Sequence, residues 1–159
     1  MSLQTKVTSM IDNQYENKIE VQEKHSILRL LSRAFSIVAA IDTCVLWRLF
    51  EGDWKSKEFK IYQNFFALVV VPTVYKEFLS MQGQRFYSIV QKDNFLKLLD
   101  VDVRYPSSAQ KKSGDNQILD ELQSIDISLF ITDNIRHFEG LTVEVMDSRK
   151  VSNLFADFN

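Results

Sequence analysis

The sequence predicts an α/β protein in which a mostly parallel central sheet is enclosed as a three-layer α/β/α sandwich. Short, continuously apolar runs of strand length occur at 36–41 (SIVAAI), 67–71 (ALVVV) and 127–131 (ISLFI). Strands that are buried on both faces have this composition. Segments with helical spacing of apolar residues lie between these runs. Alternation of strand and helix along a chain is typical of parallel sheets.

Length and composition indicate one soluble cytoplasmic domain. The chain has 159 residues, of which 45% are hydrophobic, and a formal net charge of −2. A single domain with a sizeable core fits these values, whereas a strongly basic surface that wraps duplex DNA does not. The single cysteine, Cys44, cannot form an internal disulfide. No signal-peptide pattern opens the chain, and its longest apolar run, 65–72, is too short to span a bilayer.

The first 35 residues are predicted to be a polar arm followed by an amphipathic helix, outside a main domain that spans 36–159. From Lys24 onward, one helical face carries Ile27, Leu30, Leu31, Ala34 and Phe35. Because such a stripe is usually buried, we expect this helix to pack on the domain surface, away from any active cleft. A contribution to a homodimer contact and a role as a docking helix for a protein partner are the alternatives.

The first half of the domain is predicted to contain two buried strands, each followed by two helices. The expected elements are strand 36–41, helix 43–50, turn 51–57, helix 58–66, strand 67–71, helix 73–81 and helix 84–99. In the last helix, the residues expected to face the core are Phe86, Ile89, Val90, Leu96 and either Leu98 or Leu99. Asp42 directly follows the first strand, where a helix N-terminus favours the ionised carboxylate.

The second half is predicted to add an edge strand at 100–105, a polar loop at 106–113, a helix from Asp115, strands at 127–131 and 141–146, and a closing helix at 148–158. The helix that begins at Asp115 has an apolar face formed by Ile118, Leu119, Leu122 and Ile125. Asp133 then stands at the carboxyl end of the strand 127–131. In an open α/β sheet, binding sites collect at this end of the strands.

Four acids have similar positions relative to the predicted sheet. They are Asp42, Glu77, Asp115 and Asp133. If the strand ends that carry them converge, we expect carboxylates of the first three within ~8 Å of one another, close enough to share metal ions ~4 Å apart. Carboxylate oxygens select Mg²⁺ or Mn²⁺ over zinc, and such a cluster is suited to phosphodiester hydrolysis. The alternative is that each acid is a helix cap, which is the more common role of any single one.

Three blocks of the sequence resemble the PIN-domain nucleases, a family that includes the toxins of VapBC-type toxin–antitoxin pairs. The blocks are AAIDTCVLWRLFEGD, VVVPTVYKEFLS and GDNQILDELQSIDISLFITDNIRHFEGLTVEV. Their order and rough spacing also match, and the resemblance covers about residues 37 to 147. It implies a PIN-like α/β/α fold and a Mg²⁺- or Mn²⁺-dependent endoribonuclease.

The resemblance also implies roles for particular residues. Asp42, Glu77, Asp115 and Asp133 would be the catalytic, metal-binding acids. Thr132 and Asn134 would support the fourth acid, and Thr43 would form hydrogen bonds within the site. Family members vary in which residue of the Thr-Asp-Asn turn enters the site, so Asp133 and Asn134 are alternatives. RNA would be the substrate, and an antitoxin protein would be the partner of a toxin.

Basic residues near these acids are candidates for phosphate contacts. Lys111 and Lys112 precede Asp115 and could steer a phosphate, although an exposed loop is an equally good interpretation. Arg136 and His137 follow Asp133, where a solvated surface is the simpler interpretation. A non-catalytic PIN-like module that binds RNA or protein is the main functional alternative. A phospho-acceptor domain is disfavoured, because Asp147 rather than lysine follows the last strand.

Overall fold

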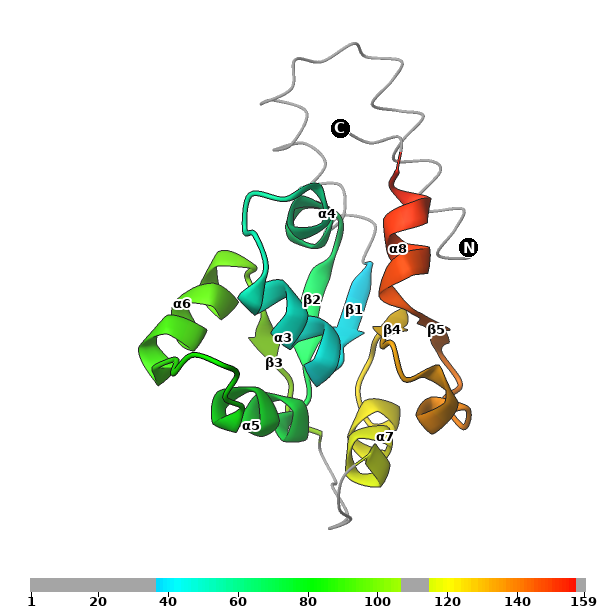
Figure 1. Cartoon of the computed structure of the whole chain (residues 1–159). Helices are drawn as coiled ribbons and strands as arrows, with labels where there is room; N and C mark the ends of the chain where they lie inside the picture. Colours follow the sequence, from blue (N-terminus) through cyan, green and yellow to red (C-terminus); the bar gives the residue numbers. More distant parts are fainter. Residues whose placement is uncertain (1–36, 107–114, 157–159) are drawn as a thin grey trace.

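The computed structural model describes residues 37–106 and 115–156, and only the backbone of Asp115 (Figure 1). Five parallel strands form one sheet in the order β3-β2-β1-β4-β5. The strands are β1 (Val38–Ile41), β2 (Ala67–Val70), β3 (Asp102–Val103), β4 (Leu129–Ile131) and β5 (Glu144–Met146). The predicted three-layer α/β class is therefore confirmed. The predicted arm and helix of residues 1–35, and Lys111 and Lys112, lie outside the described residues.

Six α-helices and one 3₁₀ helix flank the sheet in the part of the chain that is described. They are α3 (Thr43–Glu51), α4 (Lys57–Phe65), α5 (Pro72–Ser80), α6 (Ile89–Leu98), α7 (Asp115–Gln123), η1 (Ile135–Phe138) and α8 (Ser148–Leu154). None of the described helices combines the length and apolar character needed to cross a bilayer. Most elements lie where the sequence predicts them. The two edge strands, β3 and β5, are shorter than the predicted strands at 100–105 and 141–146.

The strand order creates one point where the direction of the chain reverses. β2 and β3 are added on one side of β1, whereas β4 and β5 are added on its other side. The connections from β1 to β3 therefore cross the sheet in one direction, and the connection from β3 to β4 returns across it. The carboxyl ends of β1 and β4 therefore mark the topological switch point, the place where doubly wound sheets bind ligands.

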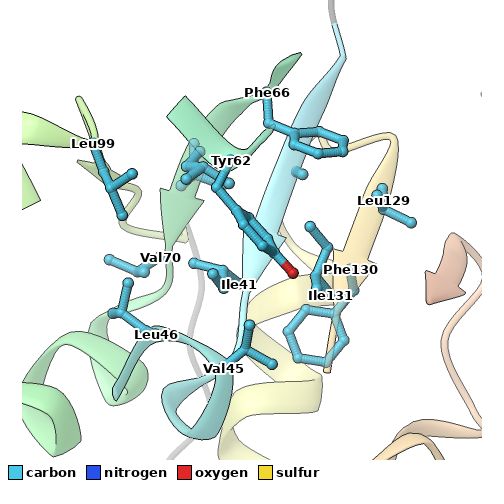
Figure 2. Close-up of a cluster of buried hydrophobic side chains, with 14 of the residues drawn as sticks. Ile41, Val45, Leu46, Tyr62, Phe66, Val70, Leu99, Leu129, Phe130 and Ile131 are labelled. Carbon is cyan, nitrogen blue, oxygen red and sulfur yellow. The ribbon is translucent and has the colours of Figure 1, made fainter. Parts of the chain in front are cut away.

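The core is made by the three central strands and by aromatic side chains from the helices above them. Ala39, Ile41, Leu129, Phe130 and Ile131 are fully buried. Figure 2 shows Tyr62 of α4 lying across this layer, with its hydroxyl directed toward Phe130 and Ile131. Burial of this apolar surface is the main force that stabilises the fold.

The interpretation of residues 84–99 is wrong in its first boundary and in three of the residues expected to face the core. The helix begins only at Ile89, because Ser88 and Gln91 form a capping box at that point. Phe86, Ile89 and Val90 are 82%, 65% and 68% exposed, and Leu98 is 42% exposed. Leu96 and Leu99 are buried as predicted, and the other buried residues of this segment are Lys92 and Phe95.

A buried lysine explains why the apolar pattern failed for α6. The Nζ atom of Lys92 donates hydrogen bonds to the carbonyl oxygens of Leu79, at 2.7 Å, and Met81, at 2.5 Å. Both carbonyls belong to the C-terminal end of α5, which carries partial negative charge. Nζ also lies 5.4 Å from the centre of the Trp47 ring. These contacts turn Lys92 inward and rotate Val90 outward, and burial lowers the pKa of the lysine.

Candidate functional site

Two buried polar residues lie at the adjacent carboxyl ends of β1 and β4. Asp42 follows β1 and Thr132 follows β4, and both are buried, with exposed fractions of 5% and 0%. The backbone N–H of Asp42 donates to the carbonyl oxygen of Ile131 at 2.9 Å. The hydroxyl of Thr132 donates to Oδ2 of Asp42 at 2.7 Å. The two strand ends are therefore joined by backbone and side-chain bonds at the switch point.

The carboxylate of Asp42 is also the N-cap of α3. Its Oδ1 accepts from the backbone N–H of Thr43 at 2.8 Å, and the thiol of Cys44 lies 3.7 Å from Oδ2. A helix N-terminus stabilises a negative charge, and hydrogen bonds to the ionised form offset the cost of burying it. These contacts can thus stabilise an ionised carboxylate at Asp42 although the residue is buried.

Thr43 links Asp42 to a second acid of the predicted set. While its backbone N–H bonds to Asp42, its hydroxyl donates to Oε2 of Glu77 at 2.6 Å. Glu77 lies on α5, the helix that follows β2, and is partly buried. Thr43 therefore forms hydrogen bonds to both Asp42 and Glu77, and the structure brings these two acids to the same residue.

Asp133 is directed toward the start of α8. Its Oδ1 accepts from the backbone N–H of Ser148 at 2.9 Å and from the Ser148 hydroxyl at 2.8 Å. The side chain of Asp133 thereby adds to the N-cap that Asp147 provides, through a bond of 2.7 Å to the N–H of Lys150. Ser148 was not among the predicted site residues, since a serine at the start of a helix carries no signal of this contact.

The residues on either side of Asp133 have different partners from those expected. Thr132 donates to Asp42 and accepts from the backbone N–H of Asn134 at 3.0 Å, so it supports the first acid. The Asn134 amide lies 4.0 Å from the sulfur of Cys44. Ile135, Arg136 and His137 continue from this turn along a shallow surface depression that Asp133 and Asn134 also line.

The third predicted acid, Asp115, is the first residue of α7. Its side chain lies outside the described part of the structure, so the expected clustering of three carboxylates stays a prediction. A different acid of the same helix, Glu121, is 2% exposed. Both of its carboxylate oxygens lie 3.2 Å from the backbone nitrogen of Thr73, and the Thr73 hydroxyl also donates to it.

The sequence analysis did not identify Glu121, although the sequence indicated that the start of α5 needs a hydrogen-bond acceptor from another part of the chain. The helix α5 begins at Pro72, and its N-cap residue, Val71, provides no side-chain hydrogen bond to the helix start. A helix start without its own cap needs an acceptor from elsewhere. The chain has 21 acidic residues, and nothing in their spacing singles out Glu121 as that acceptor.

Cys44 lies between Asp42 and the turn after β4, and its ionisation is disfavoured. Burial is the largest cause that raises the pKa of its thiol, and the negative charge of Asp42 is the next. A nucleophilic cysteine requires a lowered pKa and a positively charged environment. The surroundings of Cys44 therefore do not favour a reactive thiolate.

Within residues 37–106 and 116–156, no three His, Cys, Asp or Glu side chains are grouped so that they could hold a metal ion. Comparisons with models of protein families, with curated proteins and with solved structures found no match to this chain. The structure itself shows the fold, which is an α/β protein with a five-stranded parallel sheet. The hydrogen-bonded polar residues at the carboxyl edge of the sheet are Asp42, Thr43, Glu77 and Thr132, and they form the candidate site.

Proposed function

We propose that this chain is a divalent-metal-dependent endoribonuclease of the PIN-domain type, with Asp42, Glu77, Asp115 and Asp133 as its catalytic acids. The observation that carries the proposal is the bridge formed by Thr43. It bonds to the carboxylate of Asp42 at 2.8 Å and to that of Glu77 at 2.6 Å. These two acids meet at the carboxyl edge of the sheet, beside the topological switch point.

The donor chemistry of this pair suits a hard cation. Glu77 uses Oε2 for Thr43, and its Oε1 accepts no hydrogen bond from the described residues. Carboxylate oxygens in such a set favour Mg²⁺ or Mn²⁺. A bound cation of this kind would polarise a phosphate oxygen and lower the pKa of an attacking water.

The other residues have supporting roles in this proposal. Thr132 and Thr43 orient the first two acids, and Asp115 adds a third carboxylate from the start of α7. Asp133 or Asn134 completes the set from the turn after β4. Lys111, Lys112 and Arg136 are proposed contacts for RNA phosphates. A cytoplasmic toxin that is restrained by an antitoxin protein is one biological setting for such an enzyme.

A second candidate is a non-catalytic module with a PIN-like arrangement that binds RNA or protein. The position of Asp133 favours it, because both bonds to Oδ1 come from Ser148 at the start of α8. Asp42 likewise caps α3. Acids that cap helices need no metal to explain their presence. The two candidates differ in whether RNA is cleaved.

The test of activity is cleavage of a generic single-stranded RNA with Mg²⁺ or Mn²⁺, compared with the same reaction in excess chelator. We expect cleavage by the wild type, and loss to the background rate for Asp42→Asn and for Glu77→Gln. Asp102→Asn and Glu139→Gln are matched controls, because both acids are exposed and lie outside the site. Cleavage that survives both site variants would contradict the proposal.

Metal binding is measured separately through thermal unfolding at low salt. A cation that binds only the native state adds about 2.7 kcal/mol of stability at a concentration of 100 Kd. We expect Mn²⁺ to raise the melting temperature of the wild type and of Asp102→Asn, and to have a much smaller effect on Asp42→Asn. A metal-dependent shift without RNA cleavage would favour the non-catalytic module.

A further inference from the structure

We propose that Lys92 is a positioning residue of the candidate site, which fixes α3 against α5 and so holds Thr43 and Glu77 within hydrogen-bonding distance. This role rests on the proposed nuclease activity, in which Glu77 is a catalytic acid. Lys92 lies on α6, outside the site, and its exposed fraction is 0%. Burial of a lysine is costly unless its ammonium group is bonded. The partners of that group therefore indicate what the residue does.

The ammonium group of Lys92 binds the C-terminal end of α5. This helix ends at Ser80, its C-cap residue Met81 is extended, and its last turn contains no basic residue. The last carbonyl groups of a helix need donors from outside the helix, and a cation at this end is favoured by the helix dipole. Nζ of Lys92 donates to the carbonyl oxygens of Leu79 at 2.7 Å and Met81 at 2.5 Å.

The turn of α5 that Lys92 binds is also the turn that begins at Glu77. The backbone N–H of Met81 donates to the carbonyl oxygen of Glu77 at 2.9 Å. The hydroxyl of Ser80 donates to the same oxygen at 3.0 Å. Because these hydrogen bonds join the turn, a shift of the helix end away from Lys92 would move the backbone of Glu77 with it.

Lys92 contacts α3 as well, through Trp47, which lies one turn after Thr43. Its Nζ atom is 5.4 Å from the centre of the Trp47 ring, where a cation is attracted to an aromatic face. The same ring packs edge-on against Phe78, the neighbour of Glu77, with ring centres 6.0 Å apart. Lys92 thus binds both helices close to the 2.6 Å hydrogen bond that joins Thr43 to Glu77.

A methionine at position 92 would fill much of the same volume but would not fix the two helices in the same way. Apolar packing is non-directional, whereas the hydrogen bonds of Lys92 have defined partners and a narrow range of lengths. A displacement of about 1 Å at a reacting group can lower a rate about 100-fold. Lys92→Met should therefore affect catalysis more than it affects binding of RNA.

The first test compares RNA cleavage by the full-length wild type and Lys92→Met at a temperature where both are folded. We expect kcat to fall by about tenfold or more, with a change in KM of less than about twofold. Lys97→Met is the control for loss of a charge from α6, because Lys97 is exposed. It should keep the wild-type kcat.

Ile61→Ala is the control for loss of stability alone. Ile61 is buried in α4, which leads into the amino end of β2, away from the carboxyl edge of the sheet (Figure 1). This variant should melt at a lower temperature and keep the wild-type kcat per folded molecule. An equal fall in kcat for Ile61→Ala and Lys92→Met, or an unchanged kcat for Lys92→Met, would overturn the positioning role.

A double-mutant cycle measures the positioning without RNA, so its result does not depend on nuclease activity. Thr43→Val removes the hydroxyl that bonds to Glu77 and should lower the melting temperature of the wild type. In Lys92→Met the same substitution should lower it by about half as much or less, because the contact is already weakened. In Ile61→Ala it should keep its full effect.

The two tests separate the positioning role from the proposed activity. Equal shifts on Thr43→Val in all three backgrounds would overturn the role of Lys92, whether or not RNA is cleaved. A reduced shift in Lys92→Met, together with a wild type that does not cleave RNA, would overturn the proposed activity and support the role of Lys92 in holding Thr43 against Glu77.

Discussion

The carboxyl edge of the sheet and the core beneath α4 both bury polar atoms, but only the edge provides partners for them. Asp42, Glu121 and Thr132 are all nearly inaccessible, and each forms hydrogen bonds. The hydroxyl of Tyr62 is equally buried and has no hydrogen-bond partner among the described residues. The cost of burying a polar group depends on whether the surrounding structure provides a partner.

The two regions also differ in what their polar groups contribute to the fold. At the edge, Asp42, Glu121 and Asp133 each accept from a backbone N–H at the start of α3, α5 or α8. In the core, Tyr62 contributes its ring, which packs among the side chains of three strands (Figure 2). Removing a polar group at the edge should therefore destabilise the protein, whereas removing the Tyr62 hydroxyl should not.

The largest expected effect is at Glu121. Glu121→Leu leaves the backbone N–H and the hydroxyl of Thr73 without their acceptor inside the protein. We expect a loss of about 3 kcal/mol in the free energy of unfolding, as for charged hydrogen bonds that are removed from one side. Urea unfolding measures this value. Glu139→Leu, at an exposed position, should change it by less than about 0.5 kcal/mol. Equal values for the two variants would mean that the Thr73 contacts contribute nothing.

A smaller loss is expected for Thr132→Val, which keeps the shape of the side chain and removes its hydroxyl. Asp42 then loses a donor at 2.7 Å, and the N–H of Asn134 loses its acceptor at 3.0 Å. We expect a loss of about 2 kcal/mol in the free energy of unfolding. Thr142→Val is the matched control, because Thr142 is exposed. If the Thr132 variant is as stable as this control, the link between β1 and β4 is not held by the hydroxyl.

The opposite sign is expected in the core. Tyr62→Phe removes a buried hydroxyl that has no described partner, so we expect a gain of about 1 kcal/mol in the free energy of unfolding at pH 7. Tyr105→Phe, at a position that is 73% exposed, should be neutral. Destabilisation by Tyr62→Phe would show that the hydroxyl is bonded in solution, and the contrast between the two regions would then fail.

The smallest effect is a difference in the response to alkaline pH. Burial, followed by the charge of Glu58, raises the pKa of Tyr62 above its ordinary value of 10.0. Above pH 10 the unfolded tyrosine loses its proton while the folded one keeps it, so stability falls as the pH rises. Tyr62→Phe lacks this contribution, and its stability should fall less steeply between pH 10 and 11. Parallel curves for the two proteins would contradict the direction of the pKa shift.

The sequence by itself determined the class of the fold and the position of the first acid. β1, β2 and β4 appear as apolar runs because a strand of a doubly covered sheet needs apolar residues on both faces. Asp42 was predicted correctly at the end of β1, since a charge directly after such a run must stand at the strand end. Both signals are local patterns, because they depend on adjacent residues in the sequence and not on where the rest of the chain lies.

Only the tertiary structure decided which polar residues meet and which helix face is buried. Lys92, and not Ile89 or Val90, is buried in the first half of α6, because the carbonyl oxygens of Leu79 and Met81 lie where its Nζ atom can reach them. Glu121 meets Thr73 across 48 positions of sequence, and Asp133 meets Ser148 across 15. Such pairs depend on where the crossovers place the helices, and a hydrogen bond between distant residues leaves no periodic pattern in the sequence.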